Sequence, residues 1–390
     1  MHRRPVFATI KFMEIVIASP EEKRLREEIE KRTDAEGTRM LRFLRMPDLS
    51  RVKGSPIYEI VQRILALPDF KTFTVAQVPE IVPMRENFDL FNFPPDHPVR
   101  SRSDTYYVND DFILRTHTTI MWYYYLLRED AKKKIAAGEP IGLLSYGKVY
   151  RKDEIDRNHM NIFHQMDGLY LCRRDEQEIG LKELQDVLVM IAQAIYGKDI
   201  QYRFNKDTFP YTDPSLEMEI QVDERWVEVL GCGVVLSKVL DNLGVDSKIY
   251  NGWAFGFGLE RLAILSMQLP DIRLLWSEDE RVKRQLRLGT AYKEVSKYPP
   301  VTRDISFVVP TSFAPNDYFD VIRDVGGDFV EEVKLLDKYE NEAKFGVGKI
   351  SYAYRVVYRS TERTLVNDEV DALHHALEKK TTEEFGAVVR

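Results

Sequence analysis

The chain has 390 residues, of which 44 % are hydrophobic and 31 % charged, and its formal net charge is −7. These totals predict a soluble globular protein of two or three domains. The negative net charge excludes a protein that holds nucleic acid by bulk positive charge, so any such contact is expected to be local. Two cysteines, Cys172 and Cys232, are too few for a disulfide framework or a cysteine-rich zinc site.

Residues 1–70 are predicted to form an N-terminal helical region. Residues 20–46 are dense in Glu, Lys and Arg, with apolar residues at helical spacing, which indicates solvated helices or a packing brace. The first residues are basic, but Glu14, Glu21 and Glu22 follow too soon for a typical transit peptide, so we expect a cytoplasmic protein, with the mitochondrial matrix as the alternative. Apolar runs stay well below the roughly 20 residues of a membrane helix, so no membrane association is expected.

A region of alternating strands and helices is expected from residue 71. Residues 73–82 are predicted as one strand, and Pro79 within it indicates an edge or interface position. A second strand is expected to end at Arg115, and Thr118 is predicted to cap the helix that follows. His117 lies at this junction, where side chains point into a cleft, and both packing and ligand binding remain open for it.

The segment 147–171, GKVYRKDEIDRNHMNIFHQMDGLYL, is predicted to be a hairpin that carries charged and polar groups along one end. Arg151 interrupts the apolar run of its first strand. A planar, permanently charged guanidinium in that place indicates recognition of phosphate or carboxylate. The alternative is a solvated hairpin rim in which Arg151 pairs with Asp153.

A second unusual segment, GWAFGFGLERLAIL at residues 252–265, is predicted to be a strand that passes directly into a helix. Gly256 and Gly258 leave one face of the strand uncrowded, so that a flat ligand can lie against the backbone. Arg261 would point at that ligand from the start of the helix. The segment lacks the third glycine and the βαβ context of a dinucleotide site, so a Rossmann fold is excluded.

The C-terminal part is predicted to be a separate domain, residues 299–390, behind a linker at residues 286–298. Its predicted order β-α-β-β-α-β is the ferredoxin-like arrangement. One face of the strand at residues 351–359 carries Tyr352, Tyr354 and Tyr358, and the other carries Arg355 and Arg359. Aromatic and Arg side chains on an open sheet are typical of RNA binding, whereas burial of the tyrosines in a core is the alternative.

Ordered motifs from about Phe73 to the C-terminus resemble those of single-chain phenylalanyl-tRNA synthetases, which are class II enzymes. The motifs are NFDLFNFPPDHPVR, ILRTHTT, GKVYRKDEID with FHQMDG, FPYTDPSLEMEI, EVLGCGVV, GWAFGFGLERLA and KYPPVTRDISF. The resemblance implies an α+β fold: an antiparallel class II catalytic sheet flanked by helices (residues 71–285), followed by a C-terminal ferredoxin-like β-α-β-β-α-β domain that binds the anticodon. It also places Pro79 at the motif 1 proline of the class.

The resemblance implies binding roles for the residues that match the family motifs. For ATP and Mg²⁺ these are Arg151 at the α-phosphate, its acidic partner Asp153, His159 near the nucleotide, Arg261 at the γ-phosphate, and Glu228 and Asp213 at the metal. For phenylalanine they are His117, Thr119, Gln165 and Asp167 around the amino and carboxylate groups, and Phe209, Tyr211, Ala254, Phe255 and Gly256 around the ring. His164 is assigned to packing, and tRNA contact is expected from Tyr352, Arg355 and Arg359.

Two positions depart from the family pattern. Asp167 replaces a Glu and is one methylene shorter, so a water is expected between it and the substrate ammonium. Tyr211 stands where many relatives have Phe and places a hydroxyl group at the aromatic pocket.

The resemblance implies an ATP-dependent phenylalanine–tRNA ligase whose partners are tRNA(Phe), L-phenylalanine and ATP. It implies a monomer or homodimer that requires no separate editing subunit. Two other classes remain open: an inactive paralogue that binds tRNA or a regulatory partner, and a class II enzyme for another amino acid.

Overall fold

The computed structural model describes residues 14–152, 157–222, 224–360 and 362–390, and the side chain of residue 316 is not described. Two compact units make up the chain, Met1–Tyr292 and Lys293–Arg390. Each unit is considered by itself. In the described part of the chain, no helix combines the length and the apolar character needed to cross a membrane.

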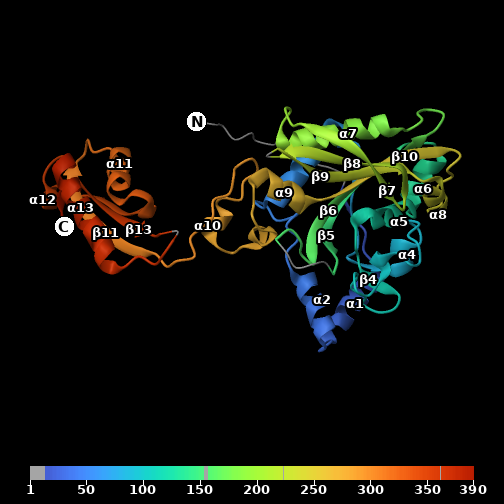
Figure 1. Ribbon diagram of the computed structural model, residues 1–390, viewed down its shortest axis with the longest axis horizontal. Helices are drawn as coiled ribbons and strands as arrows, with labels where there is room; N and C mark the ends of the chain where they lie inside the picture. The colour runs from blue at the N-terminus through green and yellow to red at the C-terminus, as the bar shows by residue number, and fades with distance from the viewer. Residues whose placement is uncertain (1–13, 153–156, 223, 361) are drawn as a thin grey trace. The chain divides into compact units, whose positions relative to one another are not determined.

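The first unit is built on an eight-stranded sheet of order β1-β2-β5-β6-β10-β9-β8-β7 (Figure 1). Its strands are β1 (Glu14–Val16), β2 (Thr74–Gln77), β5 (Ile141–Tyr150), β6 (Ile162–Arg173), β7 (Tyr202–Phe209), β8 (Thr212–Val222), β9 (Arg225–Val235) and β10 (Tyr250–Gly258). From β5 to β7 all neighbours are antiparallel, whereas β1, β2 and β5 pair in parallel. The predicted antiparallel catalytic sheet is confirmed, and β1 is an addition that the helical pattern of the N-terminus did not indicate.

The burial pattern along β8 shows that one face of this part of the sheet is covered. Residues on β8 alternate, with Leu216, Met218 and Ile220 buried and Glu217 and Glu219 between them partly exposed. The predicted hairpin is formed by β5 and β6, with Gly147 opposite Gln165. The predicted strand-to-helix segment is β10 followed at once by a helix.

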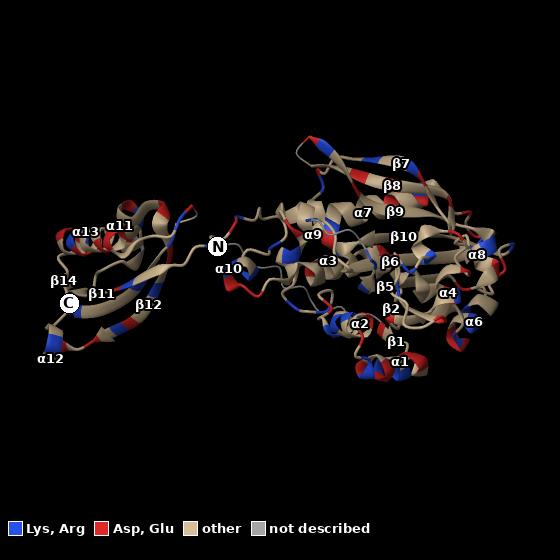
Figure 2. Ribbon diagram, turned by 60° about the horizontal axis from the view of Figure 1, so that its bottom comes forward, with Lys and Arg blue, Asp and Glu red and all other residues tan. Residues whose placement is uncertain are grey.

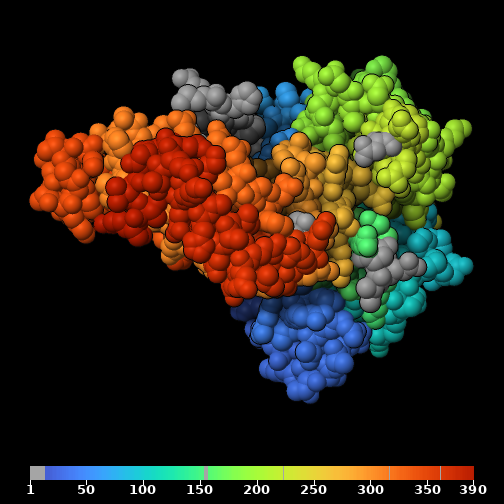
Figure 3. All heavy atoms as spheres, turned by 60° about the vertical axis from the view of Figure 1, so that its left-hand side comes forward, coloured from blue at the N-terminus to red at the C-terminus, as the bar shows by residue number. Residues whose placement is uncertain are grey.

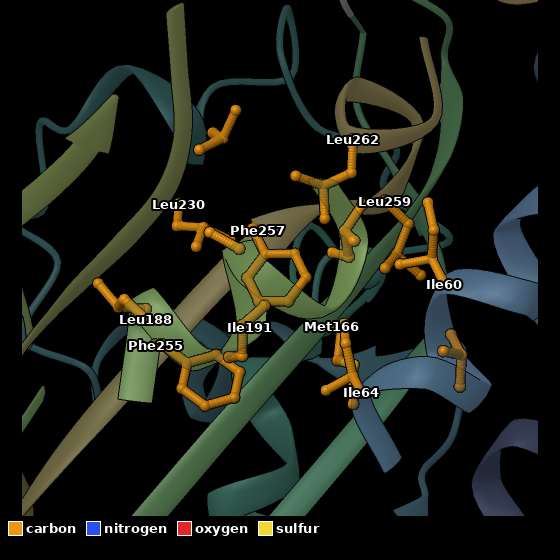
Figure 4. Close-up of a cluster of buried hydrophobic side chains, with 14 of the residues drawn as sticks. Ile60, Ile64, Met166, Leu188, Ile191, Leu230, Phe255, Phe257, Leu259 and Leu262 are labelled. Carbon is orange, nitrogen blue, oxygen red and sulfur yellow. The ribbon is translucent and has the colours of Figure 1, made fainter. Parts of the chain in front are cut away.

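Helices of the first unit cover the sheet on both sides and extend beyond it. They are α1 (Pro20–Lys31), α2 (Ala35–Arg45), α3 (Pro56–Leu65), α4 (Met84–Phe88), α5 (Met121–Leu126), α6 (Glu129–Ala136), α7 (Leu181–Tyr196), α8 (Ser237–Asn242), α9 (Leu259–Met267) and α10 (Glu280–Lys283). One core lies between the sheet and helices α3, α7 and α9, and Figure 4 shows its side chains, among them Ile60, Leu188, Phe257 and Leu262. A second core on the other face includes α5 and α8.

The charged N-terminal segment forms two helices, as predicted. Lys and Arg side chains alternate with Asp and Glu around α1 (Figure 2), and α1 and α2 project from one side of the first unit (Figures 1 and 3). Their apolar side chains are nevertheless buried: Leu25, Ile29, Met40 and Phe43 pack in a cluster with Tyr150 of β5. The segment is therefore attached to the sheet through a hydrophobic contact.

The second unit has the predicted ferredoxin-like order. Its elements are β11 (Val301–Pro310), α11 (Pro315–Gly326), β12 (Val330–Glu340), α12 (Glu342–Phe345), β13 (Lys349–Tyr358), α13 (Asn367–Phe385) and β14 (Val388–Val389). The sheet order is β12-β13-β11-β14 with antiparallel neighbours throughout. Its core contains residues of both long helices and of the three longer strands.

Three local predictions were wrong. The expected strand at residues 73–82 is divided at Pro79 into β2 and β3 (Ile81–Pro83), which belong to different sheets, because proline cannot continue the hydrogen-bond ladder. A charged helix is also predicted at residues 278–288 from the sequence, but only the short α10 forms there. Thr118 does not cap a helix; it lies inside the 3-10 turn Thr118–Ile120 that follows β4 (Phe112–Leu114).

Candidate active site

A cavity of about 530 Å³ opens in the first unit, between the β5–β6 hairpin, strands β8 and β9, and the junction of β10 with α9. Most residues that the sequence placed at a ligand site line it: His117, Thr119, Arg151, His159, Gln165, Asp167, Phe209, Tyr211, Glu228, Ala254, Phe255, Gly256 and Arg261. Asp153 lies outside the described residues, so neither its predicted role nor its alternative pairing with Arg151 is tested. The cavity therefore brings both unusual segments of the sequence to one place.

Asp167 is a buried carboxylate at one end of this cavity, with 4 % of its surface exposed. The Thr119 hydroxyl donates to its Oδ1 at 2.6 Å, and the Thr118 hydroxyl donates to its Oδ2. Burial raises the pKa of Asp167 to about 6, although the two hydroxyls and the guanidinium groups of Arg151 and Arg115 lower it. A desolvated carboxylate that both hydroxyls orient is suited to a ligand cation.

Several buried polar atoms beside Asp167 have no partner within the described residues. They are Oε1 of Gln165 and Nε1 of Trp122, and the two ring nitrogens of His117, which make no hydrogen bond of normal geometry although the Asn87 backbone lies close enough to raise the pKa of the ring. Burial, with the charge of Arg151, lowers the pKa of His117 to about 3, so its ring is neutral. Because buried polar groups are normally hydrogen-bonded, these atoms indicate where the polar groups of a ligand bind.

Aromatic side chains enclose the apolar part of the cavity. The Tyr211 ring stacks on Phe209, with centroids 6.1 Å apart, and meets Trp122 edge-on at the same distance. Burial and the nearby Asp167 carboxylate raise the pKa of Tyr211, so its hydroxyl stays protonated. Gly256 is required here, because a Cβ on it would lie 2.8 Å from Oδ1 of Asp167.

Phe255, expected around the substrate ring, is among the residues that line the cavity, but its ring is buried in the core on the other face of the sheet. Side chains alternate along β10, so Ala254 and Gly256 share the Asp167 side of the sheet and Phe255 faces the other. Figure 4 shows the Phe255 ring in the core near Leu188 and Ile191.

Two guanidinium groups also line the cavity. Arg151 Nε donates to the Thr116 carbonyl at 3.0 Å, and its guanidinium lies 5.2 Å from the centre of the Phe163 ring. Arg261 reaches the cavity from the first turn of α9, and its NH1 donates to the Glu228 carbonyl at 3.2 Å. Such a pair is suited to a polyanion. His159 also lines the cavity.

The predicted metal pair is only half present. Glu228 lines the cavity, and partial burial raises the pKa of its carboxyl group above the usual range. The Arg261 guanidinium opposes this shift, and the carboxylates of Glu217, Asp207 and Glu219 add to it. Asp213 is exposed and does not line the cavity. Since Glu219 is the residue opposite Glu228, Asp213 lies roughly 20 Å away along β8 and cannot share an ion with it. No group of three or more His, Cys, Asp or Glu side chains in the described ranges is arranged to hold a metal.

Sequence reasoning missed several residues of this site. Thr118 was interpreted as a helix cap, although a Thr pair next to His117 at a strand end was a signal for a polar contact. Trp122 also lines the cavity, and the sequence assigned it no role at a ligand site. His164 is fully buried, as its packing assignment implies, but its ring is also hydrogen-bonded to Glu260.

Of the three residues expected to contact tRNA, Tyr352 and Arg355 lie on opposite faces of β13, and Arg359 follows directly after this strand. Tyr352 is 5 % exposed and packs against Phe307 and Phe313, so its predicted position on an open face is wrong. Arg355 is exposed and pairs with Asp304 at 2.7 Å. Arg359 pairs with Glu331 at 2.9 Å.

Known proteins resemble both units. Residues 44–286 match the family described as tRNA synthetases class II core domain (F), and residues 296–390 match the ferredoxin-fold anticodon binding domain. The mitochondrial phenylalanine–tRNA ligase of Mus musculus is 36 % identical over 348 residues, which cover 80 % of this chain and 74 % of the relative. The chloroplastic/mitochondrial phenylalanine–tRNA ligase of Arabidopsis thaliana is 38 % identical over 321 residues, 80 % of this chain and 71 % of the relative. The mitochondrial enzyme of Saccharomyces cerevisiae is 32 % identical over 390 residues, 80 % of this chain and 81 % of the relative.

Proposed function

This chain belongs to the single-chain phenylalanine–tRNA ligases of the class II aminoacyl-tRNA synthetases, and we propose that its cavity joins L-phenylalanine to ATP and then to tRNA(Phe). The observation that carries the assignment of the cavity is its polarity. A buried carboxylate, Asp167, and two guanidinium groups, Arg151 and Arg261, line the cavity together. The ammonium group of an amino acid can pair with the carboxylate, and the phosphates of a nucleoside triphosphate can pair with the guanidinium groups.

We propose that Asp167 accepts the ammonium group of phenylalanine, with Thr118 and Thr119 orienting its oxygens. The unpartnered atoms of His117 and Gln165 would bind the remaining polar groups of the amino acid. Tyr211, with Phe209, Trp122, Ala254 and Gly256, would enclose the ring. The water expected between Asp167 and the ammonium remains a prediction.

The proposed reaction has two steps. The phenylalanine carboxylate oxygen attacks the α-phosphorus of ATP, the bond to the bridging oxygen breaks, and pyrophosphate leaves with that electron pair. A ribose hydroxyl at the 3′ end of tRNA then attacks the acyl carbon, and AMP leaves. Arg151 would stabilise the charge that develops at the α-phosphoryl group, and Arg261 would hold the terminal phosphates.

Class II synthetases use ATP with a divalent metal, and we propose Mg²⁺ next to Glu228. The Glu228 carboxylate lines the cavity and supplies an oxygen ligand of the kind that a hard cation prefers. A bound Mg²⁺ would neutralise phosphate charge. Isothermal titration of ATP with and without Mg²⁺, compared between the native chain and Glu228→Gln, tests this assignment.

The first experiment is ATP–pyrophosphate exchange with each amino acid in turn. We expect exchange with phenylalanine, and Arg151→Ala should lower it by at least about 10²-fold because a transition-state contact is lost. The matched control is Arg128→Ala, which removes a partly exposed Arg whose ion pair, among the residues that the structure describes, is with Asp130. Near-normal exchange in Arg151→Ala would contradict the role of Arg151.

The amino-acid series also separates the two other classes. An inactive paralogue would show no exchange with any amino acid, and an enzyme for another amino acid would prefer that substrate. The curated relatives favour phenylalanine.

We propose a mitochondrial location, the alternative to the expected cytoplasm, because the curated relatives named above carry organellar names. Fractionation of cells that express the natural gene product tests this location. We also propose that the chain is a monomer or a homodimer, which light scattering of the purified chain tests. We propose that it requires no separate editing subunit, which charging of tRNA by the chain alone tests.

A further inference from the structure

The His164 side chain lies directly behind the amino-acid end of the cavity. Side chains alternate between the two faces of the sheet along β6. Those of Gln165 and Asp167 line the cavity, whereas that of His164 points to the other face. Its ring is 0 % exposed and stacks on Trp276, with centroids 5.5 Å apart.

Both nitrogens of this ring are engaged. Nδ1 lies 2.6 Å from Oε1 of Glu260, and the backbone amide of Leu49 donates to Nε2 at 2.9 Å. An amide nitrogen can only donate, so Nε2 is the acceptor and the ring proton is on Nδ1, toward Glu260. Burial lowers the pKa of His164, but the carboxylates of Glu260 and Asp48 outweigh it and raise the pKa to about 9. The Leu49 amide opposes the second proton because it occupies Nε2 as a donor, although Oδ1 of Asp48 lies 3.3 Å from the same nitrogen. In either protonation state Nδ1 carries the proton that faces Glu260.

Glu260 connects this ring to the phosphate end of the cavity. Its carboxylate is 3 % exposed and accepts the backbone N–H of His164 at 2.9 Å on one oxygen and 2.8 Å on the other. Glu260 belongs to the first turn of α9, next to Arg261. The Arg261 guanidinium is exposed, and within the described ranges its one hydrogen bond goes to the Glu228 carbonyl. Its placement therefore depends on how the first turn of α9 is fixed.

We infer that His164 is a positioning residue for ATP: its Nδ1–H fixes Glu260, and Glu260 ties the first turn of α9, with Arg261, to the strand that binds the amino acid. The amide of Leu49, in the connection between α2 and α3, sets the ring tautomer that makes this possible. The inference rests on the proposed function, because it takes the ligand of Arg261 to be the phosphates of ATP.

Two substitutions of the same residue separate positioning from packing. In His164→Asn the side-chain amide takes the place of Nδ1 and can still donate to Glu260. In His164→Gln the amide reaches the place of Nε2, so the contact with Leu49 is kept and the donor to Glu260 is lost. Both variants remove the aromatic ring from Trp276, so each is the packing control of the other.

We expect His164→Gln to raise KM for ATP in pyrophosphate exchange about tenfold, the effect of one lost hydrogen bond to a charged group. KM for phenylalanine should stay within about twofold, and His164→Asn should stay within about twofold for both substrates. Equal KM values for ATP in the two variants, or an equal rise for both substrates, would overturn the inference. Absence of exchange in the native chain would instead overturn the proposed function.

A further variant applies if neither His164 variant folds by circular dichroism. Glu260→Gln keeps the side-chain shape but places an amide where the Nδ1–H donor needs an acceptor. The same rise in KM for ATP, with KM for phenylalanine unchanged, is expected. An unchanged KM for ATP in a folded Glu260→Gln protein would overturn the inference.

Discussion

At the scale of single residues, the protonation of Asp167 controls the amino-acid end of the cavity. Burial raises the pKa of its carboxyl group to about 6, and the ammonium group of phenylalanine pairs only with the ionised form. The carboxyl group is protonated below its pKa, so kcat/KM for phenylalanine should fall as the pH falls, about tenfold per unit below about pH 6. Pyrophosphate exchange between about pH 5 and 8 measures this profile.

The control for the pH profile is Asp167→Asn, which keeps an acceptor for the threonine hydroxyls but cannot ionise. Its kcat/KM for phenylalanine should be low and should lose the step near pH 6. A step that survives in Asp167→Asn would show that another group titrates.

Residues whose position follows from the local sequence pattern were predicted better than residues whose position depends on distant elements. Arg151 interrupts an apolar run and is correctly placed at the cavity by that local pattern. The direction of the Phe255 ring, the place of Asp213 and the burial of Tyr352 were not predicted, because they depend on strand alternation, on register between strands and on helices that cover a sheet face. Strand register and the covering of a sheet face involve elements that lie far apart in the sequence, so a local pattern does not predict them.

At the scale of secondary-structure elements, Lys148 of β5 attaches the N-terminal helices to the sheet. Its Nζ donates to the carbonyls of Leu44 at 3.0 Å and Met46 at 2.9 Å at the end of α2, and lies 3.3 Å from Glu80. The side chain is only 4 % exposed. We expect Lys148→Met to lower the free energy of unfolding by about 3 kcal/mol, because buried carbonyls and a carboxylate lose their partner. Urea denaturation followed by circular dichroism measures this change.

Lys132→Met on α6 is the matched control. Lys132 pairs with Glu129 at 3.1 Å, but both side chains are largely exposed, so the free energy of unfolding should change by less than about 0.5 kcal/mol. Equal effects of the two substitutions would show that the Lys148 contacts do not hold the N-terminal helices. The sequence predicted these helices from their periodicity, but it could not identify Lys148, since an isolated lysine in a strand gives no sign of the carbonyls it will meet.

At the scale of the whole molecule, each unit has a hydrophobic core made of its own residues. The sequence predicted this division from the change to a β-α-β-β-α-β pattern, which is a local property of the chain. The sheet order of the first unit was not predictable from local patterns, since β10 pairs with β6 across more than one intervening element.

The separate cores lead to a prediction about the two reaction steps. The residues that line the cavity all belong to the first unit. A chain cut after Tyr292 should therefore keep pyrophosphate exchange with phenylalanine within about threefold, because adenylate formation needs only those residues. Charging of tRNA(Phe) should fall at least about 10²-fold, since the anticodon-binding domain is lost and the net charge of −7 provides no general attraction for RNA. Thermal unfolding of the shortened chain checks that it is folded. Loss of exchange in a folded fragment would show that the second unit takes part in the first step, and undiminished charging would show that tRNA is bound by the first unit alone.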